Sequence, residues 1–377
     1  MIYLDYAANT PVEKDVLKIF VDSTIKYVAN PNSSHKQGRD AYKAIDNASM
    51  SIARFFDCDK DGIIYTSGAS ESNNLIIKGI ADRNKEIGRH IIISPLEHSS
   101  IIAPCNYLAS NGYEISVLPL TSKGTVDLEE LKDIIRDDTI LVSVCYVDSE
   151  LGTIQPINEI GKILKEYPNC IFHTDATQAI GKINIDFSNV DFVTFAPHKF
   201  YGLNGFGVLL NLNDIKLTPL IHGGKSTTIY RSGTPVTANV IALEKALDIA
   251  LNNLSDRYEY VSNLNKYLRD ELSIFSCVSI NSPKNSIPNT LNISLKGLDA
   301  KRIVGYLEKN EIYLSTTSAC SLSNSPSKSV LAITNDIELA KNSIRISLSH
   351  LTKSSELEKF INIFKSIYDK EINNENN

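Results

Sequence analysis

The chain has 377 residues, more than one ordinary domain contains, and its shares of 42% hydrophobic and 22% charged residues are typical of a globular protein. A formal net charge of −6 argues against a nucleic-acid-binding surface, which normally requires an excess of basic residues. Because no apolar run approaches the roughly 18 residues of a membrane span and Met1–Asp5 does not begin a secretory signal, we expect a cytoplasmic protein that binds neither membranes nor nucleic acid directly.

Through the first two thirds of the chain, short β-rich segments alternate with segments of helical periodicity. The predicted strands are residues 62–66, 90–94, 113–118, 139–145, 170–174 and 191–195. The predicted helices between them are residues 70–86, 99–110, 128–136 and 158–166. Apolar strands that alternate with helices indicate an α/β fold with a mostly parallel, doubly wound sheet covered on both faces. Such sheets bind ligands at the carboxyl ends of their strands.

The pattern changes near residue 255. Helices at residues 256–275, 300–309 and 354–369 mix with isolated strands at 290–295 and 343–347, which predicts a smaller α+β domain. We expect residues 12–254 to form the large domain, and residues 1–11 to join residues 255–377 in the small one. Residues 321–329 are rich in Ser, Asn, Pro and Lys without periodicity, and they are predicted to form a loop.

A turn suited to an anion follows the strand predicted at residues 62–66. Residues 66–72 (TSGASES) lead from that strand into a helix N-terminus, where main-chain amides and the helix dipole favour a phosphate group. The same Gly-Ser sequence also occurs in ordinary helix caps. The turn alone therefore leaves both interpretations open.

Two charged residues follow other predicted strands of the sheet. Asp175 ends the strand at residues 170–174 and Lys199 follows the strand at 191–195, so both are expected beside the same ligand crevice. There the carboxylate could pair with a protonated pyridine nitrogen, and the lysine could form a Schiff base if its pKa were depressed. Alone, Asp175 could equally be a turn residue, and most lysines are solvated surface charges.

The phosphate turn, the aspartate and the lysine occur in the order typical of fold-type I pyridoxal-phosphate enzymes. More narrowly, the chain resembles the cysteine desulfurase family of class V aminotransferases from residues 3–11 (YLDYAANTP) to about Thr352. Further segments that carry the resemblance are Asn30–His35, Glu97–His98, His222–Gly224, Arg231–Thr234, Ser318–Cys320 and Ser343–Ser347. The resemblance implies pyridoxal 5'-phosphate as cofactor, L-cysteine as substrate, and L-alanine and a persulfide on Cys320 as products.

The resemblance also implies roles for residues around the cofactor. Ala69, Ser70 and His198 would hold its phosphate, and Thr234 would reach that phosphate from a second subunit of a homodimer. Lys199 would bind the cofactor covalently.

Other residues would contact the ring and the substrate. Asp175 and Gln178 would bind the ring nitrogen and the phenolic oxygen, and His98 would stack on the ring and transfer protons. Arg345 would bind the substrate carboxylate, a task that suits its planar fork, and Asn30 is a further candidate for substrate binding.

Cys320 precedes the predicted loop at residues 321–329. A cysteine on a loop can enter a site as a thiolate and leave it carrying sulfur. The spacing from Cys320 to Val330 resembles the long-loop branch of the family, whose members pass persulfide to partner proteins. The six cysteines show no C-x-x-C pair and no zinc spacing, so no metal site is expected.

Several positions differ from the family pattern, and three of them lie at or near the expected site. Ser149, near the phenolic oxygen, replaces the usual asparagine, Ala196 replaces a serine whose hydroxyl would bind phosphate, and Lys225 follows the His-Gly-Gly segment where glycine is usual. This divergence leaves open another class V activity, such as selenocysteine lyase or aminotransferase, or a pyridoxal-phosphate-binding subunit with weakened catalysis. The sulfur acceptor is also left open between iron–sulfur cluster assembly, tRNA thiolation and other pathways.

Overall fold

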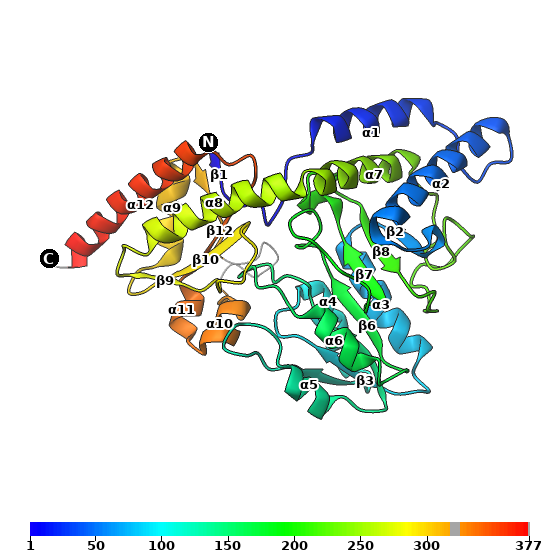
Figure 1. Ribbon diagram of the computed structural model, residues 1–377, viewed down its shortest axis with the longest axis horizontal. Coiled ribbons are helices and arrows are strands. Elements are labelled where there is room, and N and C mark those ends of the chain that lie inside the picture. Colours follow the sequence, from blue (N-terminus) through cyan, green and yellow to red (C-terminus); the bar gives the residue numbers. More distant parts are fainter. Residues whose placement is uncertain (317–324, 376–377) are drawn as a thin grey trace.

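The computed structural model describes residues 1–316 and 325–375, which form two regions, each built on its own sheet (Figure 1). The larger sheet has the strand order β2-β8-β7-β6-β5-β3-β4. Its strands are β2 (Ile63–Thr66), β3 (His90–Ile93), β4 (Glu114–Val117), β5 (Thr139–Ser143), β6 (Ile171–Asp175), β7 (Phe192–Phe195) and β8 (Gly207–Asn211). Neighbours from β4 to β7 run parallel, whereas β8 is antiparallel to β7 and β2. The mostly parallel sheet expected from the sequence is therefore confirmed.

Side chains of this sheet alternate between two faces, and helices cover both. Ile63 and Tyr65 of β2 join the core on one face, and Ile64 joins the core on the other, because successive residues of a strand point in opposite directions. The first core receives side chains from α1 (Lys14–Lys26), α2 (Lys36–Phe56), α5 (Leu128–Ile134), α6 (Ile157–Leu164) and α7 (Thr237–Asn252). The second core receives them from α3 (Ala69–Arg83) and α4 (Ser99–Ala109). The sheet is thus doubly wound.

The smaller region is built on an antiparallel sheet of β9 (Val278–Ile280), β10 (Thr290–Leu295) and β12 (Ser343–Ser347). Its core includes side chains of α8 (Leu254–Leu272), α9 (Ala300–Lys309) and α12 (Ser354–Glu375). Ile2 and Leu4 are buried in the same core, and β1 (Ile2–Tyr3) pairs with β11 (Ile312–Tyr313). These contacts agree with the α+β expectation, while the division at residues 1–11, 12–254 and 255–377 stays a prediction.

Two parts of the fold differ from the sequence-based expectation. The elements β8, α1, α2 and α7 were not predicted. The prediction of a loop at residues 321–329 is wrong for its last two residues, because α10 (Lys328–Thr334) begins at Lys328. The Ser327 hydroxyl caps this helix by accepting a hydrogen bond from the main-chain nitrogen of Val330 at 3.1 Å. The helix α11 (Ile337–Lys341) follows. Among the described residues, none of the helices has the length and apolar character needed to span a bilayer.

Candidate active site

A cavity of about 350 Å³ lies where β5, β6 and β7 end, beside the N-terminus of α3. Its volume is within the range of small-molecule sites, and its place at the carboxyl ends of parallel strands is where open α/β sheets bind ligands. The sequence-predicted residues that line it are Ala69, Ser70, His98, Ser149, Asp175, Gln178, His198, Lys199 and Arg345. The fold therefore brings together residues that are spread over most of the chain.

The turn from β2 into α3 forms one end of the cavity. Residues 67–71 line it, and the first N–H groups of a helix have no acceptor within the helix. A Cβ atom on Gly207 would lie 2.3 Å from the carbonyl carbon of Gly68, so glycine lets β8 run directly against this turn. Glu71 pairs with Arg231, with 2.9 Å between Oε1 and Nε, which offsets its negative charge. The turn is therefore suited to an anion such as phosphate.

Asp175 and His98 are joined by a chain of hydrogen bonds. Asn73 Nδ2 donates to Asp175 Oδ2 and to Ser100 Oγ, both at 2.8 Å, and Ser100 Oγ lies 2.8 Å from His98 Nδ1. The main-chain nitrogen of Thr177 donates to the other Asp175 oxygen at 2.9 Å. Because both carboxylate oxygens accept hydrogen bonds, the Asp175 side chain is held in one orientation.

The same contacts fix the tautomer of His98. The main-chain nitrogen of Ser100 donates to His98 Nδ1 at 3.2 Å, so Nδ1 is an acceptor and the neutral ring carries its proton on Nε2. Burial lowers the pKa of His98, with Asp175 opposing this effect and Lys199 adding to it. At neutral pH the ring is therefore predominantly neutral and can both release and accept a proton.

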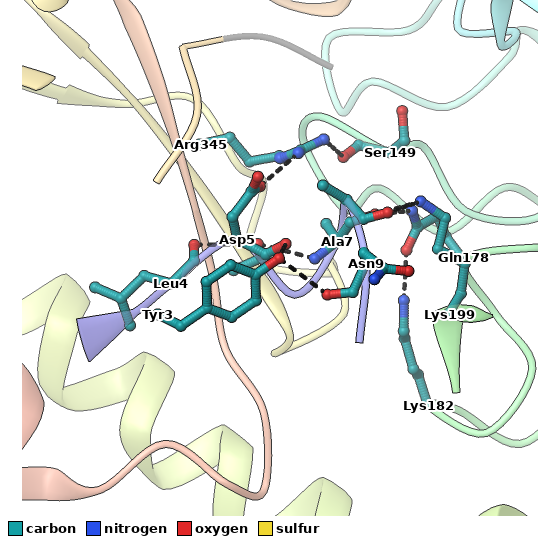
Figure 2. Close-up of polar contacts among 12 residues, drawn as sticks. Tyr3, Leu4, Asp5, Ala7, Asn9, Ser149, Gln178, Lys182, Lys199 and Arg345 are labelled. Atoms are coloured by element: carbon teal, nitrogen blue, oxygen red, sulfur yellow. Dashed lines mark hydrogen bonds and ion pairs between the residues drawn. The ribbon is translucent and has the colours of Figure 1, made fainter. Parts of the chain in front are cut away.

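Lys199 lies in a short 3-10 turn, Pro197–Lys199, directly after β7. Its Nζ donates to the main-chain oxygen of Ala7 at 2.8 Å (Figure 2). It also donates to the main-chain oxygen of Ala8 at 2.6 Å. The side-chain amide of Gln178 donates to the same Ala7 oxygen at 3.0 Å. Ala7 and Ala8 thus contact the amine that would take part in the reaction.

Arg345 reaches the cavity from β12 in the smaller region. It is 1% exposed, its Nη2 lies 2.8 Å from Asp5 Oδ1, and its Nη1 donates to the main-chain oxygen of Ser149 at 3.1 Å (Figure 2). Its buried Nε has no hydrogen-bond partner within the described part of the chain. A buried guanidinium that lines a cavity and retains bonding capacity is suited to a carboxylate.

His198 precedes Lys199 and also lines the cavity. Burial, together with the positive charges of Lys199 and Lys182, lowers the pKa of His198 to about 4. The imidazole is therefore neutral at physiological pH and can serve as a hydrogen-bond donor. Ala196, two residues before His198, is buried, and as an alanine it has no hydroxyl to offer a phosphate.

Three predicted site residues are not placed in the cavity. Cys320 lies outside the described residues. Asn30 and Thr234 are not among the residues that line the cavity in this single chain, and Asn30 Oδ1 instead accepts a hydrogen bond from the main-chain nitrogen of Asn32 at 2.9 Å. Their roles stay predictions.

Sequence reasoning missed three residues that hold the site together, namely Asn73, Asp5 and Lys182. Asn73 and Lys182 each had a weak local signal: Asn73 is a polar residue on an otherwise apolar helix face, and Lys182 lies four residues after Gln178. Asp5 had none, because its partner Arg345 is 340 positions away. Within the described residues, no group of three or more His, Cys, Asp and Glu side chains is arranged to hold a metal ion.

Comparisons with known proteins bear on this arrangement. A family model described as aminotransferase class-V matches residues 2–360. The chain is 39% identical over 374 residues to cysteine desulfurase IscS of Dictyoglomus turgidum, covering 98% of this chain and 95% of that protein. It is 36% identical over 373 residues to cysteine desulfurase IscS of Clostridium botulinum, covering 97% and 94%.

Solved structures show the same relationship. A NifS-like protein superimposes with a TM-score of 0.92 at 31% identity, covering 98% of this chain and 99% of that one. A structure described as SspA in complex with cysteine gives a TM-score of 0.81 at 32% identity, covering 93% and 99%. These findings confirm the resemblance inferred from the motifs. The chain belongs to the aminotransferase class-V family and, within it, to the cysteine desulfurases.

Proposed function

We propose that this protein is a pyridoxal-phosphate-dependent cysteine desulfurase that converts L-cysteine to L-alanine and leaves the sulfur as a persulfide on Cys320. The names of its relatives support the reaction, and one structural neighbour, SspA, was solved in complex with cysteine. The observation that carries the proposal is the convergence of Lys199, Asp175, His98 and Arg345 on one cavity.

The residues of the cavity fit pyridoxal phosphate. The turn at the N-terminus of α3 suits its phosphate, Asp175 suits a protonated ring nitrogen, and Lys199 suits covalent attachment. Thr177 lines the cavity, and its buried Oγ1 has no hydrogen-bond partner in the described residues, so a polar ligand could satisfy it. Bound pyridoxal phosphate supplies an electron sink that stabilises negative charge on the substrate carbon next to the amino group.

The chain's own residues would divide the remaining tasks. Arg345 would bind the substrate carboxylate through its fork, Lys199 Nζ would move a proton at the α-carbon, and His98 Nε2 would exchange a proton with the reacting groups. Asp175 would contact the ring nitrogen, with its side chain held in place by Asn73 and the Thr177 amide. Both Asp175 and Arg345 are buried, and burial of the charged groups strengthens their interactions with a ligand.

The sulfur step would need no oxidant. The carbon–sulfur bond of the substrate breaks, a sulfur–sulfur bond forms at Cys320 Sγ, and the hydrogen count is preserved: L-cysteine and an enzyme thiol become L-alanine and an enzyme persulfide. We also propose a homodimer, in which Thr234 of a second copy contacts the phosphate, and a protein acceptor for the persulfide. The cytoplasmic location stays a prediction.

Cys320→Ser provides the test of the sulfur step. After incubation with L-cysteine, the wild-type protein should carry one additional sulfur atom on Cys320, detected by mass spectrometry of alkylated peptides. The C320S variant should keep the cofactor's visible absorption but form no persulfide. Undiminished sulfide release by C320S would contradict the assignment of this residue.

A further inference from the structure

Lys182 is a partly buried lysine close to the cavity, and none of the tasks above involves it. It follows Gly181, whose φ of +73° turns the chain in a way that favours glycine, and it lies four residues after Gln178. Its Nζ donates to Gln178 Oε1 (Figure 2). Burial, together with the nearby positive charges of Lys199 and Arg345, lowers the pKa of Lys182 to about 7. Keeping an amine in such a place is costly, which indicates a specific use.

The contact with Lys182 fixes which way the Gln178 amide faces. The oxygen end accepts from Lys182, and the nitrogen end donates to the Ala7 main-chain oxygen at 3.0 Å. Rotating the amide by half a turn would place an oxygen against the Ala7 oxygen and an NH2 group against a lysine amine. The two oxygens would repel each other, and the NH2 group would be repelled by the charged lysine. Only one orientation of the amide is therefore favoured.

This orientation matters because Gln178 lines the cavity, whereas Lys182 is not among the residues that line it. The amide nitrogen carries two hydrogens, and only one is used by Ala7. The Ala7 oxygen also accepts from Lys199 Nζ at 2.8 Å, so one line of hydrogen bonds connects Lys182, Gln178, Ala7 and Lys199 (Figure 2). A donor is thereby offered to a ligand oxygen close to Lys199.

We propose that Lys182 is a positioning residue that holds the Gln178 amide with its NH2 group toward the cavity, where it donates to the phenolic oxygen of the cofactor. This inference rests on the proposed function, because it requires pyridoxal phosphate in the cavity. It assigns Lys182 an action through Gln178 rather than through contact with the substrate.

The test measures the visible absorption of the purified holoenzyme as a function of pH without substrate. A donor to the ionised phenolic oxygen favours the ionised form, so its loss shifts the midpoint of the absorption change upward. K182M, which keeps side-chain length but removes the donor, should raise this midpoint by about 0.5–1 pH unit and weaken cofactor affinity about three- to tenfold, as expected for one hydrogen bond. K182R, which retains a donor, should restore most of the wild-type midpoint. K18M, at an exposed lysine on α1, is the matched control.

A double-mutant cycle separates positioning from a general effect of charge. In a Q178A background, K182M should produce no further shift, because the amide through which Lys182 acts is missing. An equal shift with and without Gln178 would overturn the proposal, and so would a K182M midpoint equal to that of the wild type. If K182M does not fold, K182L makes the same test with a smaller apolar side chain. A wild-type protein without a visible band would instead contradict the proposed function.

Discussion

The two sides of the cavity are held in place in different ways. On the side of the large sheet, Asp175 and His98 are connected through Asn73 and Ser100, all within one region. On the facing side, Arg345 of the smaller region is held by Asp5 and by one main-chain oxygen. The groups proposed for the cofactor are therefore positioned by a local network, and the group proposed for the substrate by contacts that join distant parts of the chain. Substitutions on the two sides should consequently affect different measured quantities.

The largest effect is expected at Lys199, where the two sides meet. K199A removes the amine that would bind the cofactor and move a proton, so kcat/KM with L-cysteine should fall by about 10³-fold or more. The visible absorption characteristic of the wild-type protein should change at the same time. K18A, at an exposed lysine, should retain both properties. Substantial alanine formation by K199A would remove this lysine from the mechanism.

A substitution of Arg345 tests the facing side of the cavity alone. R345K keeps the positive charge but loses the planar fork, so KM for L-cysteine should rise by about 10- to 100-fold. Because Arg345 belongs to the smaller region, cofactor absorption and affinity should change little. A variant that lost cofactor affinity while keeping its KM would reverse the assignment of the two sides.

A substitution of Asn73 tests the side of the large sheet alone. N73A removes the hydrogen bonds to Asp175 and Ser100, so the affinity for pyridoxal phosphate should fall by about tenfold while KM for L-cysteine stays near its wild-type value. Equilibrium titration of the apoprotein with the cofactor gives the affinity. N111A, which removes an exposed asparagine, provides the comparison. Equal cofactor affinities of N73A and N111A would show that the network does not support Asp175.

The smallest effect concerns Glu97, which is buried next to His98. Burial raises the pKa of Glu97 to about 8, although hydrogen bonds from the Ser94 hydroxyl and the Cys145 amide oppose this. The folded protein therefore binds this proton more tightly than the unfolded chain does, and stability is lost as pH rises from about 4.5 to about 8. E97Q has no proton to lose, so its Tm relative to wild type should increase by about 2 °C or more across this range. If the difference in Tm between E97Q and the wild type stayed constant over this pH range, it would contradict a raised pKa of Glu97 caused by burial.

The sequence predicted the sheet side better than the facing side, for physical reasons. Asp175 and Lys199 follow apolar strands, and the carboxyl ends of parallel strands meet at one edge, so their convergence could be predicted from local patterns. The pairing of Asp5 with Arg345 could not, because a strand arginine carries no local sign of its partner. The strand β8 was missed because its sequence GVLLN follows a glycine-rich stretch, and its antiparallel direction depends on packing against β2 and β7.

Local sequence also failed to predict the contacts of polar residues at the ends and in the interior of helices. Lys328 and Ser329 have the composition of a loop, yet Ser327 caps α10, and the Ser329 hydroxyl donates to buried Asp148 at 2.9 Å. Asn73 is a polar residue on an apolar helix face, and its partner is not apparent until the fold places Asp175 beside it. In these cases tertiary contacts with the large region decide what local composition leaves open.

The most direct measurement of the central claim is the amount of alanine formed from L-cysteine by the wild-type holoenzyme, compared with the sulfide released in the presence of a thiol reductant. One alanine per sulfide is expected, because sulfur leaves the substrate while its amino group stays in place. Formation of pyruvate and ammonia in place of alanine, or no alanine at all, would contradict the assignment as a cysteine desulfurase.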